Sequence, residues 1–293
     1  MSRSEGALAV NSSVSGPTIG VRDSGVGGLT VARRVRETCP ASPLLYFADT
    51  AHVPYGDRSP QEVRHYALSI AGFLIERGAQ IVVFACNTTS AYALEAARQR
   101  FSVPIVGVIE PGARVAAAQA SGPIGVLATQ ATVQSGVYSR VIREASPQTP
   151  VLEVGCPKFV PLVEGEQTTS DAAYRAAEEY LAPLRRAGAD TVVLGCTHYP
   201  LLLPTLRAVW PAARFIDPAE AVAREVARLA QEVPPSVHAL GNTCFVSGAS
   251  EGVHHWASQL LPQWHPQFVA GPVFDLGAQP QDAQIQTLAT AQR

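Results

Sequence analysis

Residues 78–88, GAQIVVFACNT, and residues 188–198, GADTVVLGCTH, follow one pattern in two halves of the chain. Each stretch places a run of apolar, mostly β-branched residues before a cysteine, Cys86 or Cys196. Weaker matches in the same order, at nearly the same offset, join residues 18–21 to 123–126, 53–54 to 160–161, and 109–111 to 216–218. The order of these matches predicts two similar lobes that face each other across a cleft, each presenting one cysteine. A chance likeness between strand–turn–helix units is the alternative.

Other short apolar runs alternate with segments of helical spacing. The expected strands are residues 18–21, 44–47, 81–84, 105–108, 124–127, 151–154, 191–194 and 215–216. The expected helices include residues 60–77, 90–101, 130–145 and 171–187. Nearly continuous apolar strands are typical of parallel sheets that are covered on both faces. The sequence therefore predicts an α/β fold of two similar doubly wound lobes with mostly parallel sheets. Ligands bind at the carboxyl ends of such strands, which places the active site in the cleft.

The chain has 293 residues, of which 47% are hydrophobic and 16% are charged, and its net charge is −2. This composition is typical of a globular protein of about two domains, and it lacks the basic footprint of a nucleic-acid binder. No apolar run approaches the ~18 residues of a membrane helix, and residues 7–10 are too short a run for a signal peptide. We expect a cytoplasmic protein without nucleic-acid or membrane partners, and a flexible extension at residues 1–17.

The cysteines and the lysine limit the cofactors that the chain can hold. Five cysteines stand singly at positions 39, 86, 156, 196 and 244, and no Cys-x-x-Cys pair occurs. The spacing of possible ligands does not favour a metal site, so none is expected. A pyridoxal phosphate Schiff base would have to form on Lys158, the single lysine, which is a poor candidate. We therefore expect chemistry without a cofactor.

Cys86 and Cys196 each follow an apolar strand and precede an expected helix, for which Asn87, Thr88 and Thr197 are plausible N-caps. A thiol at a helix N-terminus has a lowered pKa, so its thiolate is usable as a base or nucleophile. The alternative is that each cysteine is a small buried hydrophobe. Burial alone explains a single cysteine better than it explains two cysteines at matching strand ends.

Polar residues also follow the other strands. The glycine-rich turn that begins at Asp23 and Ser24 lets backbone N–H groups approach an anion such as a substrate carboxylate, although a plain tight turn is the alternative. Asp49 follows the second strand, and Glu164 lies in the corresponding loop of the second half. His198 stands beside the second cysteine, where it can polarise or orient the thiol. A solvated charge for Glu164 and a structural role for His198 are the alternatives.

Taken together, these motifs resemble those of bacterial glutamate racemases. They are DSGVGG (residues 23–28), FADT (47–50), PYGD (54–57), ACNT (85–88), FVPLVE (159–164) and LGCTHYPL (194–201). The resemblance extends from about Thr18 to Ala221. Members of that family interconvert L- and D-glutamate without a cofactor and supply D-glutamate for peptidoglycan. By resemblance, the first lobe comprises residues 18–110 and 218–293, and the second lobe comprises residues 111–217.

The resemblance also implies roles for individual residues. It makes Cys86 and Cys196 the two acid/base residues. It assigns assisting roles in catalysis to Asp23, Asp49, Glu164 and His198. It assigns substrate binding to Asp23, Ser24, Tyr55, Gly56, Asn87, Thr88, Thr197 and His198. The implied partner is glutamate, a small molecule, and a homodimer is compatible with the sequence.

One position departs from the family pattern. Arg22 stands where the family usually has an apolar residue, often Phe. A charge at the end of a buried strand is costly unless it is paired. Alternation along the strand directs Arg22 opposite to Asp23 and away from the cleft. We therefore expect Arg22 to affect local packing more than chemistry.

Two cysteines on opposite walls suit a racemase, because one removes a proton from Cα while the other returns a proton to the opposite face. An aspartate or hydantoin racemase of the same superfamily is an alternative, whereas the related decarboxylases keep only one of the two cysteines. A further alternative is a binding or regulatory protein that has kept the cleft but lost turnover, with a partner such as a DNA-processing enzyme.

Overall fold

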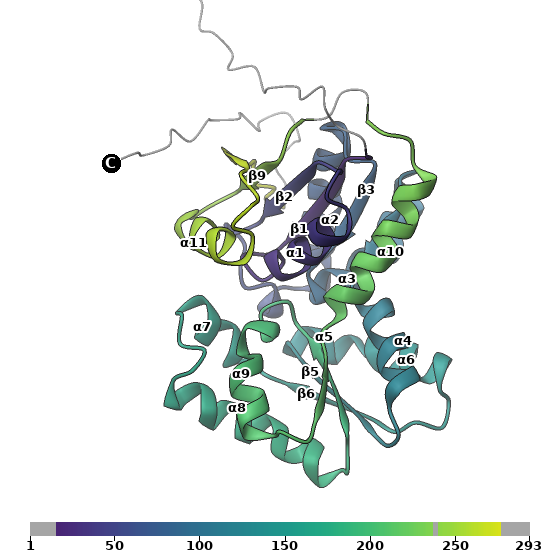
Figure 1. Ribbon diagram of the computed structural model, residues 1–293, viewed down its shortest axis with the longest axis vertical. Helices are drawn as coiled ribbons and strands as arrows, with labels where there is room; N and C mark the ends of the chain where they lie inside the picture. Colours follow the sequence, from purple (N-terminus) through teal and green to yellow (C-terminus); the bar gives the residue numbers. More distant parts are fainter. Residues whose placement is uncertain (1–15, 237–239, 277–293) are drawn as a thin grey trace, which may run out of the picture.

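Two parallel β-sheets form two lobes in the computed structural model, which describes residues 16–236 and 240–276 (Figure 1). The first sheet has the strand order β10-β9-β2-β1-β3-β4, and the second has the order β6-β5-β7-β8. The first sheet consists of β1 (Ile19–Asp23), β2 (Leu44–Ala48), β3 (Ile81–Phe84), β4 (Ile105–Gly107), β9 (Thr243–Val246) and β10 (Gln267–Ala270). The second consists of β5 (Ile124–Ala128), β6 (Val151–Gly155), β7 (Thr191–Gly195) and β8 (Arg214–Ile216).

The predicted repeat is confirmed by the order of the strands. The order β2-β1-β3-β4 in the first sheet equals the order β6-β5-β7-β8 in the second. β1 and β5 begin at Ile19 and Ile124, and β3 and β7 begin at Ile81 and Thr191, so nearly the same length of chain separates both pairs. Both sheets are parallel throughout. The α/β fold with two similar doubly wound lobes is therefore confirmed.

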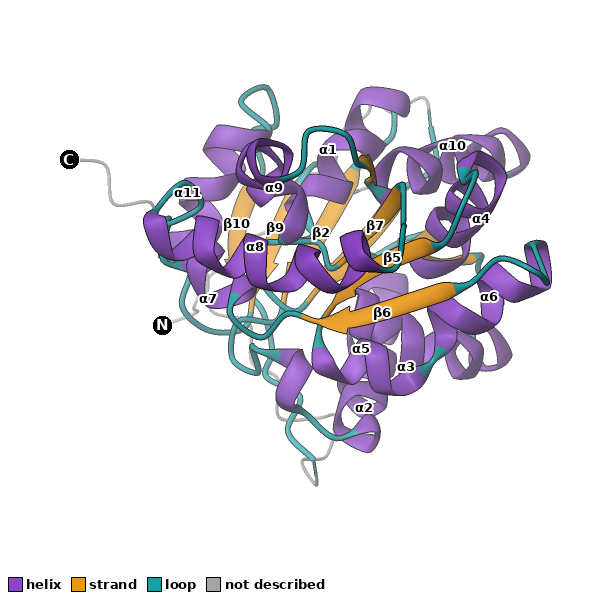
Figure 2. Cartoon of the chain, turned by 90° about the horizontal axis from the view of Figure 1, so that it is seen from below, coloured by secondary structure: helices purple, strands orange, loops and turns teal. Residues whose placement is uncertain are grey.

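Helices cover both faces of the two sheets, as the view from below shows (Figure 2). The α-helices are α1 (Leu29–Thr38), α2 (Pro60–Glu76), α3 (Asn87–Arg100), α4 (Ile109–Gln119), α5 (Gln130–Ser135), α6 (Val137–Ala145), α7 (Phe159–Glu164), α8 (Asp171–Arg186), α9 (Leu203–Val209), α10 (Pro218–Glu232) and α11 (Glu251–Leu260). Two 3₁₀ helices, η1 (Tyr55–Asp57) and η2 (Tyr199–Leu202), lie in loops that follow strands.

Local sequence explains where several helices begin and end. Ser59 and Glu62 form a capping box at the start of α2, with Pro60 at the first helical position. The single helix expected at residues 130–145 is wrong, because Gly136 adopts a left-handed conformation, with φ of 62°, and divides it into α5 and α6. Thr129 caps α5 by accepting a hydrogen bond from the N–H of Thr132.

One apolar core continues from the first lobe into the second. It contains Val21 and Val83 from the first sheet, Val126 and Val193 from the second, and Val222 from α10. A second core lies between the first sheet and helices α2 and α3, and a third lies between the second sheet and helices α8 and α9. The shared core explains why the two lobes lie against each other as in Figure 1, with α10 running beside α1 and α4.

The sequence does not predict strands β9 and β10, which extend the first sheet beyond β2. Their position supports our proposal that the first lobe comprises residues 18–110 and 218–293 and that the second comprises residues 111–217. Of the extension expected at residues 1–17, residues 1–15 lie outside the described residues, as do residues 277–293. Within the described ranges, none of the helices combines the length and the apolar character needed to cross a membrane.

The third core gives a stability prediction at Phe159. This ring is fully buried, and it packs edge-on against Tyr180 and Tyr199 with ring centroids 5.1 Å apart in each case. We expect Phe159→Ala to lower the free energy of unfolding by about 3–5 kcal/mol, because it leaves a cavity and removes two aromatic contacts. Tyr174→Ala on the half-exposed face of α8 is the control, with an expected change within about 0.5 kcal/mol. Chemical denaturation compares the two, and equal losses would contradict the packing.

Candidate active site

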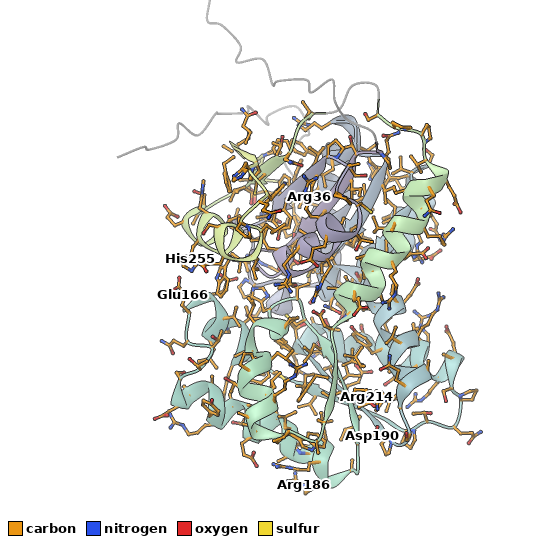
Figure 3. The ribbon with its side chains drawn as sticks, viewed as in Figure 1. Arg36, Glu166, Arg186, Asp190, Arg214 and His255 are labelled. Atoms are coloured by element: carbon orange, nitrogen blue, oxygen red, sulfur yellow. The ribbon has the colours of Figure 1, made fainter. Side chains whose placement is uncertain are left out.

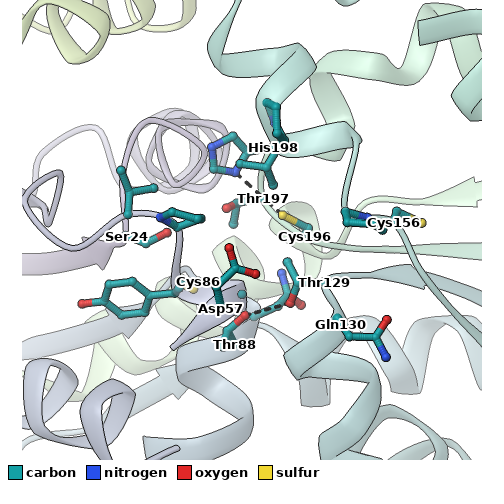
Figure 4. Close-up of a pocket in the computed structure, with 18 of the residues that line it drawn as sticks. Ser24, Asp57, Cys86, Thr88, Thr129, Gln130, Cys156, Cys196, Thr197 and His198 are labelled. Carbon is teal, nitrogen blue, oxygen red and sulfur yellow. Dashed lines mark hydrogen bonds between the residues drawn. The ribbon is translucent and has the colours of Figure 1, made fainter. Parts of the chain in front are cut away.

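A cavity of about 300 Å³ lies where the carboxyl ends of both sheets meet (Figure 4). Residues from loops of both lobes form its wall. From the first lobe they are Ser24, Val53, Pro54, Tyr55, Gly56, Asp57, Cys86, Asn87 and Thr88. From the second they are Thr129, Gln130, Cys156, Pro157, Val160, Pro161, Glu164, Cys196, Thr197 and His198. Among the predicted site residues, Asp23 and Asp49 alone are absent from this wall, and both are buried behind it.

Cys86 follows β3 and contributes to the cavity wall from the first lobe. It is itself the N-cap of α3, and no side chain caps this helix. The N-caps expected at Asn87 and Thr88 are therefore wrong, because the helix begins earlier than expected and both residues lie in its first turn. Cys86 is 6% exposed, and it lines the cavity at the edge of the second apolar core.

Cys196 follows β7 and contributes to the cavity wall from the second lobe. Its sulfur lies 3.7 Å from Nδ1 of His198 (Figure 4). Nε2 of the same ring lies 2.7 Å from Oε1 of Glu164. The α-helix expected directly after Thr197 is wrong, because the 3₁₀ helix η2 follows and α9 begins only at Leu203. The second thiol is therefore served by a Glu–His pair, and not by a helix N-terminus.

The electrostatic environments of the two thiols differ. Burial by itself lowers the pKa of His198, but hydrogen bonds to Cys196 and Glu164 raise this pKa well above its usual value. The Cys196 and Glu164 contacts therefore favour the charged form of His198, which lies against Cys196. Burial and the nearby carboxylate of Asp23 raise the pKa of Cys86, against the lowering expected from the helix N-terminus. That part of the sequence prediction is wrong for Cys86.

Asp23 joins the lobes at the base of the cavity. Its carboxylate accepts hydrogen bonds from the Gly25 N–H, at 3.0 Å, and from the Thr197 hydroxyl of the second lobe, at 3.3 Å. The Thr30 hydroxyl donates to the carbonyl oxygen of Thr197, at 3.2 Å. Burial raises the pKa of Asp23, while His198 and backbone N–H groups act against this rise. The predicted substrate residue Thr197 is thus oriented by a carboxylate from the opposite lobe.

Asn87 and Thr88 also lie at the junction of the lobes. The Tyr138 hydroxyl donates to Oδ1 of Asn87 at 2.7 Å, which leaves the amide N–H groups of Asn87 to serve a ligand. The Thr88 hydroxyl lies 3.0 Å from that of Thr129 in the second lobe (Figure 4). Both predicted substrate residues are therefore positioned by hydroxyl groups from across the cleft.

Asp49 holds the Tyr55 ring from behind the wall. The Tyr55 hydroxyl donates to the Asp49 carboxylate at 2.5 Å, and His52 contacts the same carboxylate at 2.9 Å. Burial acts to raise the pKa of Asp49, but the hydrogen bonds from His52 and Tyr55 outweigh it and lower the pKa. Asp49 is thus an ionised support for Tyr55, and the described structure does not bring it to the cavity surface.

Thr129 and Cys156 are among the wall residues that sequence reasoning misses, although the repeat points to both. Thr129 corresponds to Ser24 when β5 is aligned with β1. Cys156 corresponds to Asp49 when β6 is aligned with β2. Neither residue has a motif in its own surroundings that marks it. The alignment of equivalent strands, applied to every predicted site residue, is the signal that identifies them.

The lysine lies away from the cavity chemistry. Lys158 is exposed and forms an ion pair with Glu179 at 2.5 Å. It is not part of the cavity wall. Across the described residues, no group of three His, Cys, Asp or Glu side chains is arranged to hold a metal ion.

The chain has two similar lobes, and each places one cysteine in the wall of a shared cavity. These features define the class of protein with which the chain can be compared. A family model described as Asp/Glu/Hydantoin racemase matches residues 27–226. The chain belongs to this family, and its relatives point to the glutamate racemases within it. It is 45% identical to the glutamate racemase of Geobacter metallireducens over 246 residues, which are 83% of this chain and 88% of that protein. It is 48% identical to that of Desulforudis audaxviator over 209 residues, which are 71% of this chain and 77% of that protein.

Solved structures agree with these relatives. Glutamate racemase isoform RacE1 from Bacillus anthracis superposes with a TM-score of 0.80 at 32% identity, covering 87% of this chain and 97% of that chain. The enzyme from Francisella tularensis, solved in complex with D-glutamate, gives a TM-score of 0.81 at 26% identity and covers 88% and 98%. An aspartate racemase homologue from Pyrococcus horikoshii gives 0.54 at 17% identity, which indicates a shared fold alone.

Gly27 limits how closely the lobes approach, and this gives a first test of the site. A Cβ atom at Gly27 would lie 2.5 Å from Oγ1 of Thr197 and 2.5 Å from Nδ1 of His198. We expect Gly27→Ala to displace both residues and to lower kcat/KM for racemisation about ten- to a hundredfold. Gly252→Ala in α11 is the matched control, because its nearest neighbour would lie at 3.7 Å. Equal activity of the two variants in a steady-state assay would contradict the close approach.

The Glu164–His198 pair gives a second test, based on pH. Because the folded-state pKa of His198 is raised, its charged form stabilises the fold fully below the unfolded pKa of about 6.5. This contribution is lost as the pH rises through the raised folded value. Glu164→Gln removes one cause of the rise, so the loss should occur at lower pH than in the unmodified protein. NMR titration of His198 measures the change directly.

Glu166→Gln is the control for this titration. Glu166 pairs at 3.4 Å with His255 of α11 on the surface where the lobes meet (Figure 3). The substitution removes the same charge from a neighbouring position without touching His198. A His198 titration that is unchanged in Glu164→Gln, or that moves equally in both variants, would contradict the assignment.

Proposed function

We propose that this protein interconverts L- and D-glutamate by a two-base mechanism that uses Cys86 and Cys196. The single observation that carries the proposal is the placement of two thiols at equivalent strand ends, in opposite walls of one cavity. A carbon acid held between them can lose its proton to one sulfur and receive a proton from the other. The family membership and the glutamate racemases among the relatives support this reaction and this substrate.

The proton balance of the reaction is closed by the two sulfurs. For one enantiomer a thiolate takes the Cα proton, the electron pair stays on the substrate as a carbanion, and the opposite thiol gives its proton to the other face. The sulfurs finish with their protonation states exchanged, ready for the reverse substrate.

The residues around the sulfurs have distinct proposed roles. His198, held by Glu164, stabilises negative charge at Cys196. Asp23 orients Thr197, and Asp49 orients Tyr55. Donors aimed at the carboxylate beside Cα stabilise the carbanion as charge moves onto those oxygens. Further donors in the wall for the two carboxylates of the substrate come from Ser24, Gly56, Asn87 and Thr88.

The proposal extends to cofactor, location and assembly. Lys158, which would be needed for a pyridoxal phosphate Schiff base, is paired with Glu179 outside the cavity, and this supports catalysis without that cofactor. We place the enzyme in the cytoplasm, where its D-glutamate enters peptidoglycan synthesis, and we propose a homodimer. Light scattering of the purified protein tests the assembly.

Replacing each cysteine in turn tests the function. We expect Cys86→Ala and Cys196→Ala each to lower glutamate racemisation by at least about 10²–10⁴-fold, because each variant lacks one of the two proton-transfer groups. In D₂O, each variant should retain slow exchange of Cα hydrogen from one enantiomer only, and the two variants should retain opposite enantiomers. Cys39→Ala is the control, because Cys39 is a buried thiol that takes no part in the cavity wall.

Racemisation of both enantiomers at near the unmodified rate in either single variant would contradict the two-base mechanism. Comparable turnover of aspartate and glutamate by the unmodified protein would contradict the substrate. Tight binding of glutamate without any exchange would favour a binding protein that has kept the cleft.

A further inference from the structure

Arg22 is a fully buried cation on the Cys86 side of the first lobe. It lies near the end of β1, and its side chain leaves the strand on the face opposite to Asp23, as strand alternation requires. On that face its guanidinium donates to the Thr89 hydroxyl and, at 2.8 Å, to the Tyr55 hydroxyl. It also lies 5.0 Å from the centre of the Tyr55 ring and 6.0 Å from that of Phe84.

The two groups that bind Arg22 are both neutral. Within the described part of the chain, no carboxylate forms an ion pair with it, and its Nε has no hydrogen-bond partner. The Asp49 carboxylate is linked to Arg22 only indirectly. It accepts a hydrogen bond from the Tyr55 hydroxyl, which itself accepts one from Arg22. Asp49 and Asp23 act on Arg22 electrostatically, but neither forms an ion pair with it in the described structure, and a buried cation without such a partner is costly. A negative charge next to the guanidinium would therefore be stabilised.

Cys86 is the group next to Arg22 that can take up such a charge. Cys86 is the N-cap of α3, and Thr89 lies in the first turn of this helix. Hydrogen bonding by Thr89 acts to lower the pKa of Cys86. Because the Thr89 oxygen already accepts a hydrogen bond from Arg22, its own proton can be donated to the Cys86 sulfur. The guanidinium therefore binds a hydroxyl in the first turn of the helix that begins after Cys86.

We propose that Arg22 is the positioning residue that supplies the positive charge for the Cys86 thiolate, acting through Thr89. The inference rests on the proposed role of Cys86 as one of the two bases. It gives each thiol its own cation: Arg22 behind Cys86 in the first lobe, and His198 beside Cys196 in the second. The expectation that Arg22 affects packing more than chemistry is thereby replaced by a role in the chemistry.

The charged groups around Cys86 are consistent with this role. Burial and the Asp23 carboxylate raise the pKa of Cys86, whereas Arg22 and the hydrogen bonds from Thr89 lower it. Tyr55 faces the same thiol from η1 and stays neutral, because burial raises its pKa well above its usual value. Arg22 is thus the group of opposite charge that acts against both burial and Asp23.

The experiment measures the titration of each thiol separately from turnover. In a Cys196→Ser background, the rate of Cys86 alkylation by iodoacetamide is followed against pH, with peptide mass spectrometry to identify the modified cysteine. Arg22→Met should raise the apparent pKa of Cys86 by at least about one unit, which lowers its alkylation rate near neutral pH about tenfold. Arg22→Lys, which keeps a positive charge, should recover part of that loss.

The matched measurement uses Cys196 in a Cys86→Ser background. There, Arg22→Met should leave the rate of Cys196 alkylation unchanged, because His198 is the charged group beside that thiol. No shift at Cys86, or an equal shift at both cysteines, would overturn the proposal and leave Arg22 a packing residue. If Arg22→Met does not fold, Thr89→Val tests the proposal instead. This variant keeps the Arg22 cation and removes the Thr89 hydroxyl that binds it. A raised pKa at Cys86 alone supports the proposal, and an unchanged pKa overturns it.

Alkylation does not require glutamate or turnover. A protein that fails to racemise glutamate would therefore still give the Cys86 titration, so failure of the proposed function and failure of this inference are distinguishable. In the unmodified background, Arg22→Met should lower kcat/KM about tenfold or more in both directions, since L- and D-glutamate have an equilibrium constant of one. A loss in thermal stability alone, with kcat/KM unchanged, would overturn the inference.

Discussion

A sulfur atom that is shielded from water can hold a negative charge only if a cation or hydrogen-bond donors replace the lost solvent, and this constraint governs the whole site. Cys86 and Cys196 are each 6% exposed. The parallel sheets bring both sulfurs to the same cavity because the carboxyl ends of their strands face each other. His198 and Glu164 lie at one thiol, and Arg22 and Thr89 at the other, where the constraint requires them.

The arrangement of the two lobes around the cleft depends on polar contacts that cross it, in addition to the shared apolar core. These contacts join Asp23 to Thr197, Tyr138 to Asn87, and Thr88 to Thr129. Each one pairs a residue of one lobe with a residue that lines or supports the cavity from the other. A buried donor or acceptor left unpaired costs about 1–3 kcal/mol, so these pairs hold the cleft in one arrangement. The residues that we propose as substrate donors are thereby positioned in advance, which would limit the entropy lost on binding.

Much of the fold and of the candidate site can be predicted from the sequence, because the patterns that indicate them are local. Continuous apolar runs such as residues 81–84 predict the strands, and residues that follow them, such as Cys86 and Ser24, lie in the cavity wall. The features that sequence reasoning misses depend on distant parts of the chain. The strand at residues 243–246 is short and pairs with β2 at residues 44–48, so no local pattern marks it. The pKa of Cys86 depends on burial in the folded core, and the role of Arg22 depends on Thr89 lying beside it.

The two lobes have the same backbone arrangement, but their charged side chains stand at different positions. The reaction explains why each thiol needs a cation. The repeat partner of His198 is Thr88, and that of Arg22 is Leu127, so the cation stands on a different element in each lobe. Racemisation in either direction passes through both proton transfers, with the same carbanion between them. The slower transfer limits both directions, so a cation at one thiol alone would leave the other transfer limiting. Each sulfur therefore needs its own cation, and any buried position that lies close enough can supply it. In this chain the position in the first lobe is residue 22, which the strand turns away from the cavity but toward the helix that carries Cys86.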